Sequence, residues 1–478
     1  MSQDFDRTTG ALNPYKVEST QRPGGPLNFD DRTSALNSAR WKIYLRIMPL
    51  LFICYVIAYV DRTNVGIAKL TMKNDLQGFD DWVFGFGSGI FFIGYFLLEI
   101  PGSIIVERWS ARKWICRIMV TWGILAALTA FVKTPIQFYS VRFLLGLAEA
   151  GFFPGVIVYL THWFPAKDRA RAIAGFLIAS PIAMIVGNGV SRYLLQIGDK
   201  GNPRVLDLAG WQWVYIFWGV PAVVMGIAVL VFLTDRPRDA MWLTKDERDS
   251  LEDELAKEKA AHRGAHLRSA LAGLINPRVW ILAIAYFGVV TANYGLEMFL
   301  PSVLEEWFSA EPYSFTASGI ATLAMIPSLL VIIGQLLNGW SSDHFKERYW
   351  HAIVPIVFGA AVLICVPHVK TSLVLAMVCF TIAAAGMKAY MPAFWSLPNT
   401  FLTATAAAGS VGLINSVGNL GGFLGPYTMG YVKTYFKSYD YGLYFLAMTS
   451  LISAMIVFSM RFIPMPSAQS DDESSQEH

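Results

Sequence analysis

Residues 102–113 read GSIIVERWSARK, and residues 339–348 read GWSSDHFKER. Each stretch follows a long apolar run, begins with a glycine, and contains an acid followed by basic residues. The two stretches occupy corresponding places in the two halves of the chain, so they form a weak internal repeat. Duplicated halves related by pseudo-symmetry, with a binding site at their interface, are typical of membrane transporters.

The composition supports a membrane protein. Of the 478 residues, 54% are hydrophobic and only 15% are charged, whereas a soluble chain carries roughly a quarter charged residues. So much apolar surface has to face lipid, and a lipid bilayer is therefore an expected partner. The net charge of +3 is too small to favour a nucleic acid as a further partner.

Twelve apolar runs are long enough to cross a bilayer, which takes about 20 residues in a helix. They are residues 43–66, 84–106, 114–132, 136–160, 171–196, 212–234, 278–303, 317–340, 351–367, 371–395, 406–431 and 441–463. The polar, charge-rich stretch 235–277 separates six runs from six. The expected plan is a disordered lead (1–40), a six-helix bundle (41–234), a linker (235–277), a second six-helix bundle (278–464) and a disordered tail (465–478).

Lysine and arginine gather in the loops on one side of the expected bundle. They follow the second, fourth and eighth runs, as Arg108, Arg112, Lys113, Arg117, Lys167, Arg169, Arg171, Lys346 and Arg348. By the positive-inside rule these loops, the linker and both termini are predicted to be cytoplasmic. With no cleavable signal peptide expected, the bacterial inner membrane is the predicted location.

The four cysteines lie in or beside apolar runs, with no CxxC pair and no neighbouring histidine. Neither a disulfide framework nor a metal site is indicated, and no cofactor is expected. No HExxH motif and no Ser–His nucleophile arrangement falls within the spans, so an intramembrane enzyme is not favoured.

Several segments resemble one known family. The stretch 102–113 resembles the signature after helix 2 of the major facilitator superfamily, and residues 142–154, RFLLGLAEAGFFP, resemble its helix 4 motif. Residues 59–66 (YVDRTNVG), 294–301 (YGLEMFLP), 394–398 (FWSLP) and 415–426 (NSVGNLGGFLGP) are similar to its anion:cation symporter family. The resemblance implies an all-α membrane protein of twelve transmembrane helices in two bundles. It further implies a monomer that imports an organic acid anion by proton symport with alternating access. In the two loop copies it implies gating or structural roles for Gly102, Glu107, Arg108, Arg112, Gly339 and Asp343.

Seven ionisable residues fall within the apolar runs, where each costs roughly 2.5–3.5 kcal/mol on insertion scales and is a candidate functional group. They are Asp61, Arg62, Glu99, Arg142, Glu149, Glu297 and Lys388. Adjacent residues on a helix point about 100° apart, so Asp61 and Arg62 need partners elsewhere. Arg142 and Glu149 share a helix face, and Gly146 between them leaves room for a neighbouring backbone.

The predicted roles follow from side-chain chemistry. Arg62 is the expected anion clamp, because a guanidinium binds carboxylate bidentately. Asp61 and Glu149 are the expected proton carriers, with Arg142 setting the proton affinity of Glu149. Lys388 has two interpretations: a second cationic contact suited to a dicarboxylate, or a charge pair with Glu297. Glu99 also has two interpretations: structural pairing, or a function in transport.

Uncharged side chains complete the predicted substrate site. They are Tyr59, Tyr95, Asn293, Tyr294, Trp395, Asn415 and Asn419, although for the aromatic ones plain helix packing is an equal alternative. The glycines around Asn419 are expected to allow close helix contact. An exchanger or a uniporter, or a sensor that binds the acid without transporting it, stays open beside the symporter.

Overall fold

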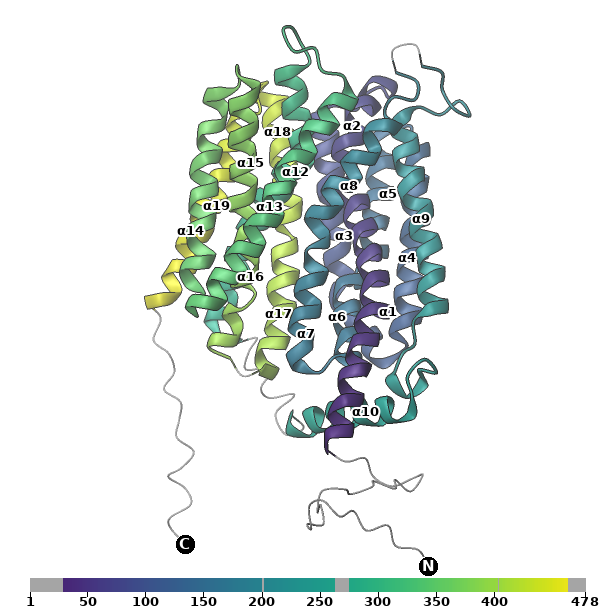
Figure 1. The fold of residues 1–478 in the computed structure, drawn as a ribbon. Helices are drawn as coiled ribbons and strands as arrows, with labels where there is room; N and C mark the ends of the chain where they lie inside the picture. Colours follow the sequence, from purple (N-terminus) through teal and green to yellow (C-terminus); the bar gives the residue numbers. More distant parts are fainter. Residues whose placement is uncertain (1–28, 200–201, 263–274, 403, 463–478) are drawn as a thin grey trace, which may run out of the picture.

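The computed structural model describes residues 29–199, 202–262, 275–402 and 404–462, and these ranges are almost wholly helical. Among them, eleven helical segments are long and apolar enough to cross a membrane. The remaining expected run, residues 406–431, is also helical, but it is divided into two shorter helices. The chain thus has the two six-span halves that the sequence predicts (Figure 1).

The N-terminal half contains six spans, three of which are built from two consecutive helices. In chain order its helices are α1 (Phe29–Thr63), α2 (Val65–Asp75), α3 (Asp81–Arg108), α4 (Ala111–Leu128), α5 (Pro135–Glu149), α6 (Phe152–Trp163), α7 (Ala166–Leu177), α8 (Ala179–Leu194) and α9 (Gly210–Phe232). The break between α5 and α6 falls at Gly151, whose φ of +85° suits a residue without a side chain. Glu149 is therefore the last residue of its helix.

The linker and the C-terminal half follow the same plan. Helix α10 (Lys245–His262) lies in the linker, and the second half contains α12 (Pro277–Phe308), α13 (Ala317–Phe345), α14 (Tyr349–Cys365), α15 (Leu373–Ala389), α16 (Met391–Phe394), α17 (Ala404–Asn419), α18 (Gly421–Phe436) and α19 (Asp440–Ser459). The eleventh span breaks at Leu420, between α17 and α18. Each of those helices has 16 residues, too few to span a bilayer alone.

Small residues let the helices of each half approach closely, as is usual where lipid gives no hydrophobic drive to association. A Cβ on Gly425 would lie 2.1 Å from the carbonyl oxygen of Thr291 in α12, and one on Gly146 would lie 2.0 Å from that of Phe91 in α3. Both glycines therefore serve close helix contact, as expected.

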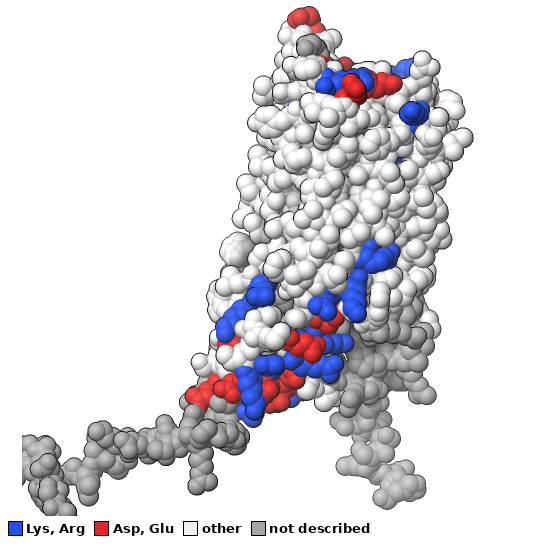
Figure 2. Space-filling model, turned by 90° about the vertical axis from the view of Figure 1, so that its right-hand side faces the viewer, with Lys and Arg blue, Asp and Glu red and all other residues white. Residues whose placement is uncertain are grey.

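Figure 2 shows lysine, arginine, aspartate and glutamate gathered at the two ends of one face, with an uncharged band between them. This distribution fits a chain whose middle faces lipid. The end that carries α10 is called the linker side below, and the opposite end the far side.

The prediction that residues 29–40 lack structure is wrong, because α1 begins at Phe29. Its polar first turns are held by contacts with the linker side of the same half. Arg40 forms an ion pair with Asp168, and the Glu247 carboxylate of α10 accepts hydrogen bonds from Ser38 and Lys42. Residues 1–28 and 465–478, the rest of the predicted disordered ends, lie outside the described residues, as do residues 463 and 464 at the end of the predicted second bundle.

Glu247 makes the docking of α10 on α1 depend on pH. Burial opposes its ionisation, but hydrogen bonds from Lys42, Ser38 and the Thr244 backbone N–H outweigh burial and lower the pKa of Glu247 to about 2 from 4.5. A carboxyl with a lowered folded pKa stabilises the docked state above about pH 4.5, and that stability is lost as the pH falls toward 2. We expect hydrogen exchange in α10, corrected for the intrinsic rate, to accelerate over this window.

The Glu247→Gln protein should show faster exchange in α10 already at pH 7, with little further change on acidification. The matched control is Asp253→Asn, because Asp253 meets Arg32 at 3.5 Å with both side chains about half exposed and such pairs contribute little. Equal protection of α10 in the Glu247→Gln and wild-type proteins would contradict this assignment.

Candidate functional site

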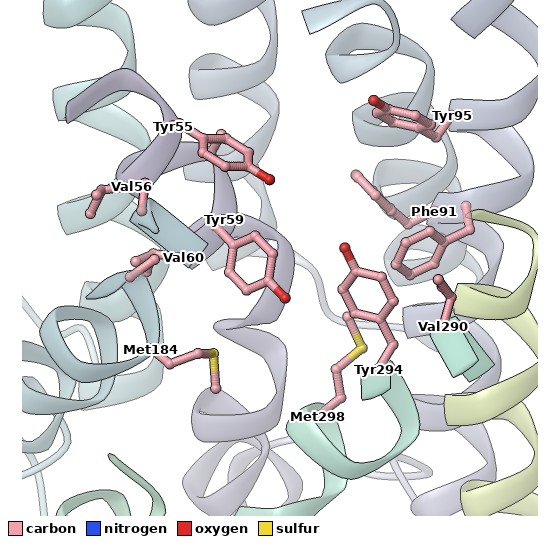
Figure 3. Packing of buried hydrophobic residues seen from close by; sticks show 14 of the residues in the cluster. Tyr55, Val56, Tyr59, Val60, Phe91, Tyr95, Met184, Val290, Tyr294 and Met298 are labelled. Carbon is pink, nitrogen blue, oxygen red and sulfur yellow. The ribbon is translucent and has the colours of Figure 1, made fainter. Parts of the chain in front are cut away.

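A cavity of about 70 Å³ lies between the two halves, with room for several water molecules. Figure 3 shows the tyrosines around it: the hydroxyl groups of Tyr55 and Tyr59 on α1 face those of Tyr95 on α3 and Tyr294 on α12. All nine residues predicted to bind substrate line this cavity, namely Tyr59, Arg62, Tyr95, Asn293, Tyr294, Lys388, Trp395, Asn415 and Asn419.

The cavity extends from its charged residues toward the linker side. Helix α1 runs from the linker side to the far side, so Tyr55 lies nearer the linker than Tyr59 does. By the same reasoning Tyr286 on α12 and Trp395 beyond α15 lie on the linker side of Tyr294 and Lys388, and both line the cavity.

The far side is closed by contacts between the halves. A Cβ on Gly66 would lie 2.5 Å from the carbonyl oxygen of Met298, and one on Gly85 would lie 2.6 Å from that of Pro426. The backbones of the two halves therefore touch there. The structure thus has its far side sealed and its cavity directed toward the linker.

The first charged pair in the cavity is Arg62 with Glu149. The two side chains form a buried ion pair between α1 and the end of α5, both in the N-terminal half. Arg62 also donates a hydrogen bond of 2.8 Å to the hydroxyl of Tyr294 in the other half. The second carboxylate oxygen of Glu149 is buried without a hydrogen-bond partner among the described residues.

Asp61 and Arg142 lie behind this pair and are fully buried. Asp61 accepts hydrogen bonds from Trp122 Nε1 at 2.8 Å and Asn64 Nδ2 at 3.2 Å. Arg142 donates one of 3.3 Å to the backbone carbonyl of Arg62. As expected, Asp61 and Arg62 find separate partners.

The expected link between Arg142 and Glu149 is not direct in this structure. Glu149 has Arg62 as its ion-pair partner. Seven helical residues rise about 10.5 Å along the axis, so two side chains at that spacing share a face without meeting. Arg142 instead supports the backbone of Arg62 and stacks over the Phe91 ring at 5.2 Å.

The second charged pair is Lys388 with Glu297, in the C-terminal half. Their side chains form an ion pair between α15 and α12. Tyr59 donates a hydrogen bond of 2.8 Å to Glu297, and Lys388 donates one of 3.1 Å to the Tyr59 hydroxyl oxygen. The charge pair that the sequence offered as one alternative is thus formed, while Lys388 also lines the cavity.

Glu99 joins the two halves on another side of the cavity. Its carboxylate on α3 accepts a hydrogen bond of 2.5 Å from Asn415 on α17. Of the two alternatives for Glu99, this contact between the halves corresponds to structural pairing. It lies beside two cavity residues, Tyr95 and Asn415.

The predicted gating residues at the linker side bind within their own halves. Arg112 donates to the carbonyl oxygen of Leu233 at 3.3 Å and lies 3.7 Å from Asp235, while Asp343 pairs with Arg348 at 2.6 Å. The side chains of Glu107 and Arg108 lie outside the described part of the structure. Gly102 lets α3 approach Gly151, to which a Cβ would lie at 3.2 Å, and Gly339 similarly faces Pro392 at 3.3 Å.

A polar cluster at the far side was not predicted from the sequence. The Lys69 ammonium, buried on α2, pairs with Asp81 at 2.5 Å, and Asp81 also accepts a hydrogen bond of 2.6 Å from Tyr439 of the other half. Lys69 lies beyond the first predicted run, which ends at residue 66, whereas the helix continues to Asp75. The available signal was the four-residue spacing of Lys69 and Lys73, which puts both on one helix face.

Comparisons with known proteins agree with this fold. The model of the Major Facilitator Superfamily matches residues 51–426. A "Putative tartrate transporter" of Agrobacterium vitis is 41% identical over 87% of this chain and 89% of its own length. The "Putative metabolite transport protein NicT" of Pseudomonas putida is 38% identical over 91% and 96%. Among solved structures, the xylose transporter XylE from E. coli, in a partially occluded inward open conformation, aligns with a TM-score of 0.67 at 13% identity over 88% of this chain and 98% of its own.

Proposed function

Because this chain belongs to the major facilitator superfamily, and is therefore a membrane transporter rather than an enzyme, we propose that it imports a small organic acid anion together with protons. The linker side is the cytoplasmic side of a bacterial inner membrane in this proposal, and the protein works as a monomer by alternating access. The names of the relatives, among them "Putative tartrate transporter", support an organic acid as the substrate.

The observation that carries the proposal is the ion pair between Glu149 and Arg62. Arg62 lines the cavity, yet a carboxylate of its own half occupies its guanidinium. A substrate carboxylate has to compete with Glu149 for that group. Because a proton on Glu149 removes the competing charge, proton binding and anion binding favour each other at this site.

The transport cycle follows from that competition. On the far side, protonation of Glu149 frees Arg62, and the substrate carboxylate binds the guanidinium bidentately. The halves then rock, and the far side closes as it is closed here. On the linker side Glu149 loses its proton and again binds Arg62, which releases the anion. Asp61, held by Trp122 and Asn64, is the second proton carrier, and Arg142 holds the backbone of Arg62 in place.

Single acids from a panel are added to de-energised cells that express the protein. We expect one of these acids to make the medium more alkaline. The Asp61→Asn and Glu149→Gln proteins should give no alkalinisation, because neither amide takes up a proton. A pH electrode records the change, and labelled acid records counterflow. Asp239→Asn is the matched control, since Asp239 is an exposed linker acid 3.8 Å from Arg238.

Counterflow of the acid without any pH change in wild-type cells would replace symport by exchange or uniport. Binding of the acid without counterflow would indicate the sensor alternative. Wild-type alkalinisation by the Asp61→Asn protein would remove Asp61 from the proton carriers.

A further inference from the structure

The two ion pairs of the cavity occupy equivalent positions in the two halves. Helix α1, in the first span, carries Tyr59 and Arg62 three positions apart. Helix α12, the first span of the second half, carries Tyr294 and Glu297 at the same spacing. The pattern of a tyrosine followed three positions later by a charged residue is therefore repeated, with the charge reversed.

The partners of these charged residues are also equivalent. Arg62 pairs with Glu149 on the fourth span, and Glu297 pairs with Lys388 on the tenth span, which is the fourth of its half. Each half thus contributes one cation that lines the cavity and one carboxylate that pairs with it. In one half the first span carries the cation, and in the other half the fourth span carries it.

Hydrogen bonds between the halves join the two pairs. Tyr59 donates to Glu297 at 2.8 Å, and Arg62 donates to the Tyr294 hydroxyl at 2.8 Å. The Tyr59 and Tyr294 rings stack with their centroids 6.3 Å apart. Each ion pair is therefore hydrogen-bonded to a tyrosine of the other half, and these two tyrosines stack on each other.

Lys388 is placed to bind a ligand and not only to pin two helices. Its ammonium has three donors, of which one goes to Glu297 and one to Tyr59. The side chain lines the cavity that Arg62 also lines. A cation that faces the cavity and is covered by a carboxylate of its own half is the arrangement seen at Arg62 and Glu149.

We propose that Glu297 and Lys388 form a second proton-controlled anion site, in which protonation of Glu297 frees Lys388 to bind the second carboxylate of a dicarboxylic acid. The first carboxylate binds Arg62. This inference rests on the proposed function and names its substrate class. Each dianion therefore travels with one proton, held by Glu297, in addition to those that Glu149 and Asp61 carry.

Among the groups that face Glu297, one is a cation and the others are neutral tyrosines. Lys388 faces it from α15, Tyr59 and Tyr55 from α1, and Tyr294 from its own helix. Tyrosines stay neutral near pH 7, so Lys388 is the one charged group of this set. A proton on Glu297 leaves the positive charge of Lys388 uncompensated inside the cavity, where a second carboxylate restores neutrality.

The test is the number of protons carried per substrate by purified protein in proteoliposomes, with the membrane voltage clamped at zero. Tartrate is the probe, and threonate, which has the same four-carbon chain with one carboxylate replaced by a hydroxymethyl group, is its matched monoacid. We expect one proton fewer per tartrate in the Glu297→Gln protein than in the wild type, because its amide cannot take up the proton that Glu297 carries.

The Glu297→Gln/Lys388→Met protein removes both charges and avoids leaving one unpaired. Its ratio of tartrate to threonate uptake should fall at least tenfold from the wild-type ratio. The control is Lys370→Met/Asp440→Asn, which removes a 2.8 Å ion pair of the same half away from the cavity and should leave that ratio unchanged.

The same number of protons per tartrate in the Glu297→Gln protein as in the wild type, or equal losses of tartrate and threonate uptake in the double variant, would overturn this inference alone. Proton-coupled uptake of threonate but not of tartrate by the wild type would do the same. If the wild type carries neither acid with protons, the proposed function fails, and this inference fails with it.

Discussion

Replacing Arg62 with alanine should lower the affinity for the transported acid at least a hundredfold and abolish its uptake. The guanidinium is the cavity group best suited to bidentate carboxylate binding, and truncating one partner of a buried charge pair costs about 2–5 kcal/mol. Since about 1.4 kcal/mol is a factor of ten, a loss of two decades lies within that range. Equilibrium binding of labelled acid to purified protein measures the affinity, and counterflow measures uptake.

The alanine variant also leaves the Glu149 carboxylate buried without its partner, which can destabilise the fold by itself. The Arg62→Met/Glu149→Gln protein removes both charges and should fold while still failing to bind the acid. Arg204→Ala is the control, because Arg204 pairs with Asp75 at 3.0 Å on the half-exposed rim of the same half. Wild-type affinity in the folded double variant would show that Arg62 does not bind the substrate.

Much of the fold could be predicted from the sequence, because lipid imposes a simple rule on it. Each span needs about 20 apolar residues, and one long charged segment, 235–277, stands between two sets of such runs. The breaks inside spans were harder to predict. Gly151 and Leu420 end helices within apolar runs, and hydropathy alone does not record a change of backbone direction.

The residues of the cavity could be predicted because polar groups inside a membrane are few and costly. Of their pairings, the sequence offered only that of Glu297 with Lys388, as one of two alternatives. Arg62 and Glu149 lie 87 positions apart, and Tyr59 and Glu297 lie 238 apart. Which carboxylate meets which cation depends on helix rotation and on the state of the transporter, as the separation of Arg142 from Glu149 shows.

The second large effect is expected for Gly85→Val, a substitution in the contact that closes the far side. A Cβ at position 85 would lie 2.6 Å from the carbonyl oxygen of Pro426 and 2.9 Å from the Cα of Gly430, both on α18 of the other half. Backbone atoms of two packed helices cannot move aside as a flexible side chain can. The sealed state is therefore disfavoured, and we expect transport to fall at least tenfold while the acid still binds from the far side.

A cysteine reporter distinguishes this outcome from misfolding. Ser302 on α12 is buried at the far side in the sealed structure. The Ser302→Cys protein should therefore resist a membrane-impermeant maleimide. Cys365 is exposed, so the background carries Cys365→Ser. With Gly85→Val added, the same cysteine should react readily. Gly175→Val is the control, because a Cβ at position 175 meets no atom within 4 Å. A Gly85→Val protein that binds the acid, transports it at the wild-type rate and protects the cysteine would mean that the contact between α3 and α18 does not close the far side.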